Sequence, residues 1–390
     1  MPNLEGPSRT APARTSGAAL LLALALASCS IPEPDRSARP AKTASPSASA
    51  ASPPESAASP APEPFAPTRV SLEDRAMGTH ILLAAFTTKE MGSDKIRPVL
   101  EKALAEIRRL EGLMTTWRPD SELSQVNAAA GKKPIKVSPE TLEVIQKSIW
   151  MSKASEGVFD ITFEAMHGLW KFDEDLEEKI PPAPAVAAAR ALIDYRKIKI
   201  DEAKSTVMLE KPGMRMSLGG IAKGYAVDAA TRVLRAGGIP SFFVQAGGDL
   251  YVQGKKPDGA PYRVGVRDPR GKGETDFFAM LEVENHAFST AGDYERSFVD
   301  GGKRYHHIID PRTGYPATAS RSVTIWAKDA FTADAIDDAV FILGPEKGLK
   351  LVESIEDCGA VIVDEHNKLW VSSRLREQHL QVLRPPTDGI

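Results

Sequence analysis

The chain has 390 residues, of which 42% are hydrophobic and 26% are charged, and its formal net charge is −3. A chain of this size and hydrophobicity can bury a sizeable core, which excludes wholesale disorder. Its 49 basic and 52 acidic residues nearly cancel, so bulk electrostatic attraction to nucleic acid or to an anionic membrane is excluded. An anionic ligand would have to be small and held by local contacts.

The first 28 residues have the pattern of a secretory signal peptide: Arg9 and Arg14 precede an apolar run over residues 18–27. That run is about half of the ~20 residues that a membrane-spanning helix needs. Leu26-Ala-Ser-Cys29 resembles a bacterial lipobox, in which the cysteine thiol takes the lipid, so we expect lipidation at Cys29. The alternative is a plain signal peptide with an accidental cysteine. Lipidation would leave Cys358 without a disulfide partner, and we expect Cys358 to be a buried thiol.

Residues 29–67 are rich in Pro, Ala and Ser and offer no apolar face to bury. We expect a disordered tether, which at ~3.1 Å per residue could hold a folded domain on the order of 100 Å from a lipid surface. From Val70 onward the composition is that of a globular protein, without a second low-complexity break. We therefore expect one folded domain over residues 68–385.

Strand and helix signals alternate irregularly along this domain. Helices are predicted at residues 96–114, where apolar residues recur at helical spacing, at 138–155, where a proline stands at the start, and at 223–236. Strands are predicted at residues 75–86, 197–200, 205–209, 242–246, 262–266 and 277–283. This order favours an α+β domain over a regular array of βαβ units.

A glycine-rich segment at residues 216–228 is predicted to run from a strand through Gly219 and Gly220 into a helix. Glycine lets a ligand approach the backbone closely, and the N–H groups of the first helical turn, together with Lys223, favour an anion. The segment is not a Walker loop, and it does not have the Gly-x-Gly-x-x-Gly pattern. The alternative interpretation is an ordinary strand-to-helix turn with a surface lysine.

Three acidic residues share one face of a predicted helix that Gly344-Pro345 ends. Asp334, Asp337 and Asp338 stand at positions i, i+3 and i+4. Carboxylates this close suit Mg²⁺, which also binds substrate phosphate oxygens, and Ca²⁺ would fit as well. The alternative is a set of solvated acids that interact with the helix dipole.

Two adjacent histidines, His306 and His307, end a strand-like segment ahead of a Pro/Gly turn. Side chains alternate along a strand, so at most one imidazole is expected to face a site. Because the unperturbed pKa of histidine is near neutrality, that imidazole could serve as general base for a hydroxyl nucleophile. A structural hydrogen bond is the alternative role.

Eight short motifs follow one another in order along the domain. They are Ala76-Met-Gly-Thr79, the segment 116–127 (TWRPDSELSQVN), Gly157-Val-Phe-Asp-Ile-Thr162, the segment 218–228 (LGGIAKGYAVD), Gln245-Ala-Gly-Gly-Asp249, Ser289-Thr-Ala-Gly-Asp-Tyr-Glu295, His307-Ile-Ile-Asp-Pro-Arg-Thr-Gly314 and Ala333-Asp334. Together they resemble the ApbE family of FAD:protein FMN transferases. The resemblance implies a T-fold-like α+β domain in a periplasmic, lipid-anchored and Mg²⁺-dependent enzyme. It would transfer FMN from FAD to a Thr or Ser hydroxyl of a target protein and release AMP.

The resemblance also implies a set of site residues. FAD would lie among Met77, Trp117, Val158, Phe159, Asp160, Ser217, Lys223 and Ile308. Asp334 and Asp338 would hold the metal, with Asp337 close by and the backbone carbonyl of Gly220 completing the protein ligands. His307, rather than His306, would take the proton of the acceptor hydroxyl, because it directly precedes Ile-Ile-Asp-Pro. Ser217 stands where the family often has Asp, and Asp338 where many members have Thr.

Two other functions stay open at this point. Water in place of the acceptor hydroxyl would make the chain an FAD pyrophosphatase that yields free FMN and AMP, and without chemistry it would be a flavin-binding lipoprotein. For the transferase, the resemblance implies an acceptor protein that is a subunit of a membrane redox complex. We expect the chain on the periplasmic side of the inner or outer membrane, anchored through Cys29 and without a nucleic-acid partner.

Overall fold

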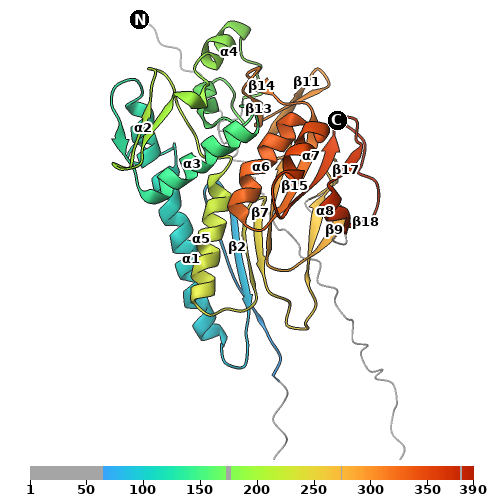
Figure 1. Ribbon diagram of the computed structural model, residues 1–390. Helices are drawn as coiled ribbons and strands as arrows, with labels where there is room; N and C mark the ends of the chain where they lie inside the picture. The colour runs from blue at the N-terminus through green and yellow to red at the C-terminus, as the bar shows by residue number, and fades with distance from the viewer. Residues whose placement is uncertain (1–64, 173–176, 274, 378–379) are drawn as a thin grey trace, which may run out of the picture.

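The computed structural model describes residues 65–172, 177–273, 275–377 and 380–390. The predicted signal peptide, Cys29 and the predicted tether up to residue 64 lie outside the described residues. Helices and mostly antiparallel sheets are combined in one domain, so the α+β prediction is confirmed (Figure 1).

An eight-stranded sheet forms the centre of the domain, and all of its neighbouring strands are antiparallel. In sheet order its strands are β1 (Arg69–Ala76), β2 (Thr79–Phe86), β6 (Phe242–Ala246), β7 (Asp249–Gln253), β10 (His286–Gly292), β15 (Ser320–Ala327), β16 (Cys358–Asp364) and β17 (Leu369–Val371).

Both faces of the sheet are buried, and strand alternation divides the residues of β2 between two cores. Ile81 and Leu83 pack beneath the helical layer, whereas Leu82 packs on the opposite face. The helices over the first face are α1 (Ser93–Met114), α5 (Ala222–Ala236), α6 (Ala330–Leu343) and α7 (Pro345–Glu353). A small sheet of β8 (Tyr262–Arg267), β9 (Phe277–Val283) and β18 (Gln381–Val382), together with α8 (Ser373–Glu377), packs against the second.

Smaller elements surround one end of this sandwich (Figure 1). They are α2 (Glu122–Ala128), α3 (Pro139–Ala154), α4 (Ala183–Arg190), the 3₁₀ helices η1 (Ile161–Met166) and η2 (Tyr195–Lys197), a sheet of β3 (Ile135–Lys136), β5 (Thr206–Leu209) and β4 (Ile198–Asp201), and the hairpins β11 (Ser297–Asp300) with β12 (Lys303–His306) and β13 (Ile309–Asp310) with β14 (Tyr315–Pro316).

The predicted single strand over residues 75–86 is wrong, because a hairpin turn divides this segment. Arg75 and Ala76 end β1, and β2 begins at Thr79. Met77 and Gly78 form the two-residue turn, with φ of 53° and 70°. Two consecutive positive φ values are typical of a type I′ turn, whose twist matches that of the hairpin. Methionine rarely adopts this conformation, so its side chain gave no turn signal.

The predicted strand ahead of the paired glycines is also absent, and residues 210–221 form a loop between β5 and α5. The Asn127 side chain holds this loop: its Nδ2 donates to the Met216 carbonyl at 2.9 Å, and its Oδ1 accepts from the Met216 N–H at 2.8 Å. An amide side chain thus takes the place of a neighbouring strand. Asn127 ends one of the eight motifs, which gives that motif a structural role.

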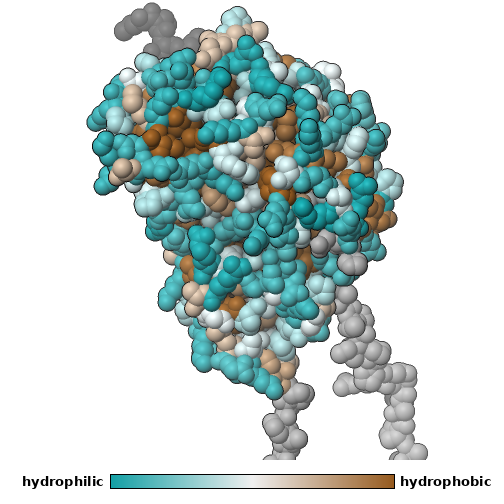
Figure 2. Space-filling model, in the orientation of Figure 1, coloured by the Kyte–Doolittle hydropathy of each residue, from teal (hydrophilic) through white to brown (hydrophobic). Residues whose placement is uncertain are grey.

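The face seen in Figure 2 is largely hydrophilic, with apolar residues gathered mainly toward the upper part of the molecule. Among the residues that the structure describes, no helix combines the length and apolarity needed to span a bilayer.

Candidate metal and flavin site

At Gly224 the helices α5 and α6 lie in close contact. A Cβ at this position would lie 2.2 Å from the Ala330 carbonyl oxygen and 2.7 Å from the Cβ of Asp334. The Gly224 N–H donates a 2.7 Å hydrogen bond to Oδ2 of Asp334. The missing side chain therefore lets the first turn of one helix fix a carboxylate on the other.

Three buried carboxylates meet beside this crossing. Oxygen atoms of Asp249, at the start of β7, and of Asp334 and Asp337, on α6, lie within 4.8 Å of one another. None of the three residues is more than 4% exposed. Lys223 Nζ lies 2.7 Å from Oδ2 of Asp249 and 3.2 Å from Oδ1 of Asp334.

Ser289 of β10 joins the same group. Its hydroxyl lies 2.7 Å from Oδ1 of Asp249 and 2.5 Å from Oδ2 of Asp337. A hydroxyl has one hydrogen, so at any moment Ser289 donates to only one of these carboxylates.

The cluster carries more negative charge than its lysine can balance. Burial, with repulsion from Asp249, raises the pKa of Asp334 to about 7, and burial with repulsion from Asp338 and Asp334 raises the pKa of Asp337 well above its usual value. Burial opposes the charge on Lys223, but attraction to Asp249 and Asp334 is stronger and raises its pKa. If a bound cation displaced these protons, three ionised carboxylates and one ammonium would carry a net charge of −2, and the oxygen ligands suit Mg²⁺ or Ca²⁺.

Asp338 lies on the flank of this cluster, against the glycine turn. Its Oδ2 would be 2.8 Å from a Cβ on Gly220, so a side chain there would displace it. Burial raises the pKa of Asp338 to about 6. The structure thus brings together all four predicted metal-site residues, Gly220, Asp334, Asp337 and Asp338. The interpretation of this trio as solvated helix-end acids does not hold, because Asp334 and Asp337 are buried.

Sequence reasoning assigned no role to Asp249 and Ser289, although each lies in one of the eight motifs. They stand on separate strands, 40 residues apart, and only the pairing of β7 with β10 makes them neighbours. In the sequence, a role for these two residues was indicated by their position in the motifs 245–249 and 289–295.

The predicted anion-binding end of α5 is occupied from within the protein. The Ala222 N–H donates to the Leu218 carbonyl at 2.8 Å, and the Gly224 N–H is taken by Asp334. Lys223 faces the aspartates rather than the surface. The anion held by this helix end is therefore the Asp334 carboxylate.

The two histidines have different surroundings. His306 is 3% exposed, its Nε2 donates to the Ala317 carbonyl at 2.8 Å, and its Nδ1 lies 3.3 Å from the Ile308 N–H. Its ring also packs edge-on against Phe341. These contacts use both ring nitrogens, so His306 is a structural residue.

His307 follows β12, and its backbone N–H donates to the Arg296 carbonyl at 3.2 Å. Its Nδ1 is buried and makes no hydrogen bond to any residue in the described part of the chain. Burial lowers the pKa of His307 well below its usual value, and Arg296, His306 and Lys223 add to the effect. The imidazole is therefore neutral at pH 7, within the electrostatic reach of the aspartate-bound lysine.

Several predicted flavin-binding residues line the same region. Phe159 is buried, and its ring edge would lie 3.7 Å from a Cβ on Gly220. The Ser217 hydroxyl accepts from the Gly219 N–H at 3.2 Å. Ile308 follows His307 directly and is buried, as is Val158. Phe159 and Ser217 therefore contact the glycine turn that also faces Asp338.

Three other predicted flavin-binding residues, Trp117, Met77 and Asp160, contact other parts of the chain. Trp117 is 71% exposed and its ring meets His167 edge-on at 6.4 Å. The Met77 N–H, in the hairpin turn, donates to Glu111 at 2.6 Å. Asp160 caps η1: Oδ1 accepts from the Thr162 N–H and hydroxyl, and Oδ2 accepts from the Tyr195 N–H. Asp160 is thus engaged in holding the η1 loop.

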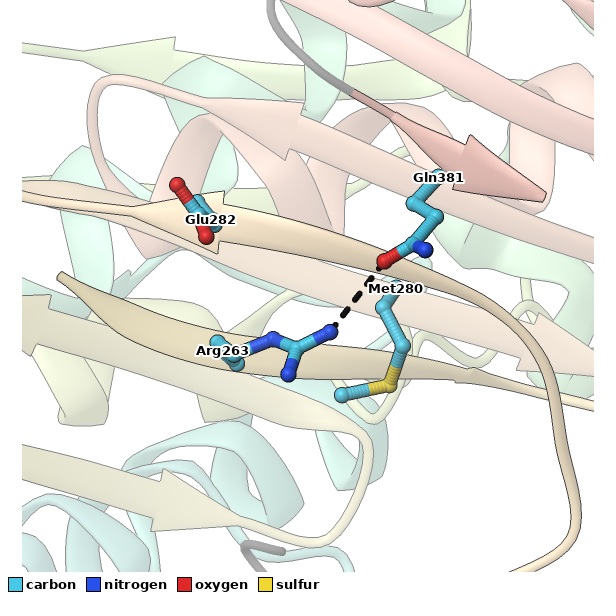
Figure 3. A pocket seen from close by; sticks show the side chains of 4 residues that line it. All are labelled: Arg263, Met280, Glu282 and Gln381. Carbon is cyan, nitrogen blue, oxygen red and sulfur yellow. Dashed lines mark hydrogen bonds between the residues drawn. The ribbon is translucent and has the colours of Figure 1, made fainter. Parts of the chain in front are cut away.

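A pocket of ≈ 270 Å³ lies elsewhere, on the small sheet (Figure 3). Arg263, Met280, Glu282 and Gln381 line it, and Arg263 donates to Gln381 at 3.2 Å. None of these residues belongs to the aspartate cluster or to the predicted flavin-binding set.

Known proteins are similar to this chain in both sequence and fold. An FAD:protein FMN transferase of Klebsiella pneumoniae is 31% identical over 317 residues, which is 80% of this chain and 89% of the relative, and one of Haemophilus influenzae is 31% identical over 293 residues, 73% and 83% of the two chains. The crystal structure of the ApbE protein of Thermotoga maritima has a TM-score of 0.73 at 31% identity and covers 80% of this chain and 99% of its own. The flavin transferase ApbE of Vibrio cholerae has a TM-score of 0.70 at 26% identity, with 80% and 100% covered.

The sequence profile of the ApbE family matches residues 77–362. This match begins at the hairpin turn, ends within β16 and contains every residue of the aspartate cluster. The chain belongs to the ApbE family.

Proposed function

We propose that this protein is a Mg²⁺-dependent FAD:protein FMN transferase. The oxygen of an acceptor Thr or Ser attacks the phosphorus of the FMN half of FAD, the P–O–P bond breaks, and AMP leaves with the bridging oxygen. The observation that carries the proposal is the buried group of Asp249, Asp334 and Asp337, whose oxygens converge beside a single lysine. Relatives of this chain carry the name FAD:protein FMN transferase.

The aspartate cluster fits a hard divalent cation by its donor chemistry. All donor atoms are oxygens, and they lie within 4.8 Å of one another. Gly220 has no side chain, and a Cβ there would lie 2.8 Å from Oδ2 of Asp338. Asp249, Asp334 and Asp337 would hold the ion, with Asp338 beside it. A bound Mg²⁺ supplies charge stabilisation for the pyrophosphate oxygens. Lys223 stays charged next to the carboxylates and orients Asp249 and Asp334.

His307 is the proposed general base. Its neutral imidazole has a buried Nδ1 without a partner among the described residues, so this atom can accept the proton of the acceptor hydroxyl. His306 cannot take this role, because both of its ring nitrogens are engaged. Phe159, Ile308 and Ser217 would contact FAD around the glycine turn, and exposed Trp117 would offer a flat face to one of its rings.

The decisive experiment mixes the purified protein with FAD, Mg²⁺ and a candidate acceptor, a redox subunit of a membrane complex. We expect AMP release in step with a mass gain of one FMN on the acceptor. AMP with free FMN and an unchanged acceptor would instead support an FAD pyrophosphatase. FAD binding without AMP would support a flavin-binding lipoprotein, and either result would overturn the transferase proposal.

The proposal also includes a lipid anchor at Cys29 and a periplasmic location. Its support is the lipobox-like segment ahead of Cys29 and the Pro/Ala/Ser-rich composition that follows it. Expression of the full chain and of its Cys29→Ser variant tests this point. We expect only the unaltered chain to fractionate with membranes and to carry a diacylglycerol mass at its mature N-terminus, whereas equal fractionation would contradict the anchor.

A further inference from the structure

Two arginines and one aspartate lie close to His306: Asp293 is buried, and Arg270 and Arg304 are partly buried. Arg270 makes two 2.7 Å hydrogen bonds to Asp293, and both side chains are 9% exposed. Arg304 of β12 lies near enough to this pair that burial, together with the charge of Arg270, lowers its pKa. The charges of Asp293, Arg304 and Arg270 also reach His306. One carboxylate cannot balance two guanidinium groups, so the arginines need further acceptors.

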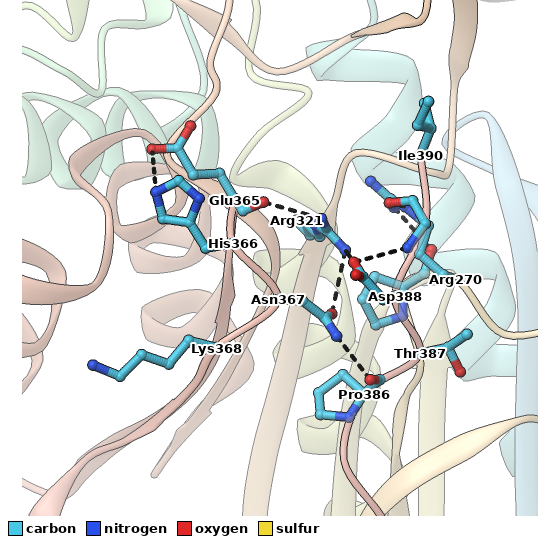
Figure 4. A network of polar contacts seen from close by, with 12 residues as sticks. Arg270, Arg321, Glu365, His366, Asn367, Lys368, Pro386, Thr387, Asp388 and Ile390 are labelled. Atoms are coloured by element: carbon cyan, nitrogen blue, oxygen red, sulfur yellow. Dashed lines mark hydrogen bonds and ion pairs between the residues drawn. The ribbon is translucent and has the colours of Figure 1, made fainter.

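Residues 384–390 supply those acceptors. The Ile390 carbonyl accepts from Nη2 of Arg304 at 2.9 Å, and the Gly389 carbonyl accepts from Nε of Arg270 at 3.4 Å. We call residues 384–390 the C-terminal strap. Figure 4 shows its last residues beside Arg270 and Arg321.

The strap is anchored along its length before it reaches Arg304. Arg384 pairs with Asp268 and Asp276. Thr387 donates from its N–H and hydroxyl to Oδ2 of Asp268, at 2.9 and 2.7 Å. Asp388 pairs with Arg321 at 3.1 Å (Figure 4). Asp268 itself is 1% exposed, so this anchor is buried, whereas the Asp388 side chain is 82% exposed.

The β11–β12 hairpin connects the strap to His307. Phe298 and Tyr305 are cross-strand partners, and their rings stack at 5.3 Å on one face. Phe172 and Trp170 extend that stack. Alternation puts Arg304 on the opposite face together with Ser297, to which it donates at 2.8 Å. The hairpin is a separate two-stranded sheet, and such a ribbon is marginally stable without outside contacts.

We propose that the C-terminal strap positions His307 by clamping this hairpin through Arg304. Aromatic stacking holds one face of the ribbon. On the other face the strap bonds to Arg304, and the His306 ring bonds to Ala317. The backbone of His307 bonds to Arg296, just ahead of β11, so both ends of the hairpin determine where the imidazole lies. Arg304 is a positioning residue, not a catalytic one. This inference rests on the proposed role of His307 in FMN transfer.

Two changes to the full protein test the clamp, and a third is the control. Thr387→Val with Asp388→Ala loosens the strap without altering the hairpin, and Arg304→Met removes the bonds to Ser297 and Ile390. Arg263→Met breaks a bond between β8 and Gln381 of β18, and neither residue belongs to the strap or to the hairpin (Figure 3). Each variant is measured by hydrogen exchange over residues 297–309, by FAD affinity, and by the rate of AMP release with saturating FAD, Mg²⁺ and acceptor.

We call Thr387→Val with Asp388→Ala, and Arg304→Met, the two strap variants. We expect both to exchange faster over residues 297–309 and to release AMP at least tenfold more slowly, with FAD affinity unchanged within twofold. Arg263→Met should match the unaltered protein. Arg304→Lys should restore part of the rate, since one ammonium can still reach a strap carbonyl.

Unchanged exchange over residues 297–309 would overturn the clamp, and so would a loss of FAD affinity that parallels the loss of rate. If the unaltered protein binds FAD but releases no AMP, the proposed transfer fails while the exchange data still decide whether the strap holds the hairpin. If the unaltered protein transfers FMN and the strap variants do so equally fast, the clamp fails and the transferase stands.

Discussion

The backbone N–H of Gly224, in the first turn of α5, donates a 2.7 Å hydrogen bond to the carboxylate of Asp334 on α6. The neighbouring Lys223 contacts the same carboxylate at 3.2 Å. A helix N-terminus and a cation therefore stabilise one ionised oxygen pair in the interior. This contact fixes the position of the cluster relative to the glycine turn. It depends on the close approach of α5 and α6 at Gly224, which has no side chain.

Replacement of Gly224 by Ala should destabilise the protein by about 1–3 kcal/mol, because the new methyl group would overlap the Ala330 carbonyl. Gly112→Ala, in helix α1, is the matched control. A Cβ there meets nothing closer than 3.8 Å, so helix propensity should leave stability equal or raise it by up to about 1 kcal/mol. Urea unfolding measures both, and equal midpoints for the two variants would contradict the close approach.

Mg²⁺ affinity should weaken as pH falls from 8 to 6. The pKa of Asp334 is raised to about 7 by burial and by Asp249, so the metal-free cluster holds protons that Mg²⁺ must displace. Each displaced proton lowers affinity up to about tenfold per pH unit below its pKa. Calorimetry at pH 6, 7 and 8 in two buffers measures affinity and proton release. Asp337→Asn should reduce both, whereas an affinity independent of pH would contradict this electrostatic picture.

His307→Asn should abolish FMN transfer and leave FAD binding intact, since only the proposed proton acceptor is removed. His306→Asn is the informative comparison. It should lower thermal stability, because the bond from Nε2 to Ala317 and the packing on Phe341 are lost. Transfer by the His307 variant at the rate of the unaltered protein would remove His307 from the mechanism. Mass spectrometry of the acceptor and FAD fluorescence titration provide the two readouts.

Trp117→Ala should weaken FAD binding about 2- to 10-fold, which corresponds to ~0.5–1.5 kcal/mol for one aromatic stacking contact. Stability should not change, because the side chain is 71% exposed. Trp117→Tyr should keep most of the affinity. The control is Trp150→Ala on α3, which removes another partly exposed tryptophan and should leave FAD binding unaltered. Equal affinities for Trp117→Ala and the unaltered protein would place the flavin elsewhere.

The Cys358 thiol should resist alkylation in the folded protein. Burial raises its pKa to about 12, so the reactive thiolate is scarce at pH 8. By linkage, the folded state binds this proton more tightly than the unfolded state, and stability should decline as pH rises above 9 toward 12. Iodoacetamide labelling followed by mass spectrometry, with and without denaturant, measures the difference. Rapid labelling of Cys358 under native conditions would contradict its burial.

Regular elements with strong local signals were predictable from the sequence. The apolar spacing over residues 96–114 and the Ser138-Pro139 start correspond to α1 and α3. The helix ending at Gly344-Pro345 ends at Leu343, with Gly344 at a φ of 77°. The hairpin at Met77-Gly78 was missed because a left-handed methionine is set by strand pairing, not by local preference.

The acidic trio on α6, Lys223, the histidine pair and the order of the eight motifs were all visible in the sequence, because helical spacing and short motifs are local properties. Which carboxylates share one small volume was decided by tertiary structure alone. Asp249 and Ser289 join Asp334 only because β7 pairs with β10 beneath α6. The same holds for the two histidines, since the His306 ring bonds to Ala317, whereas Nδ1 of His307 has no hydrogen-bond partner among the described residues. Such contacts join segments far apart in the chain, and their energies depend on burial, which spacing along the chain does not specify.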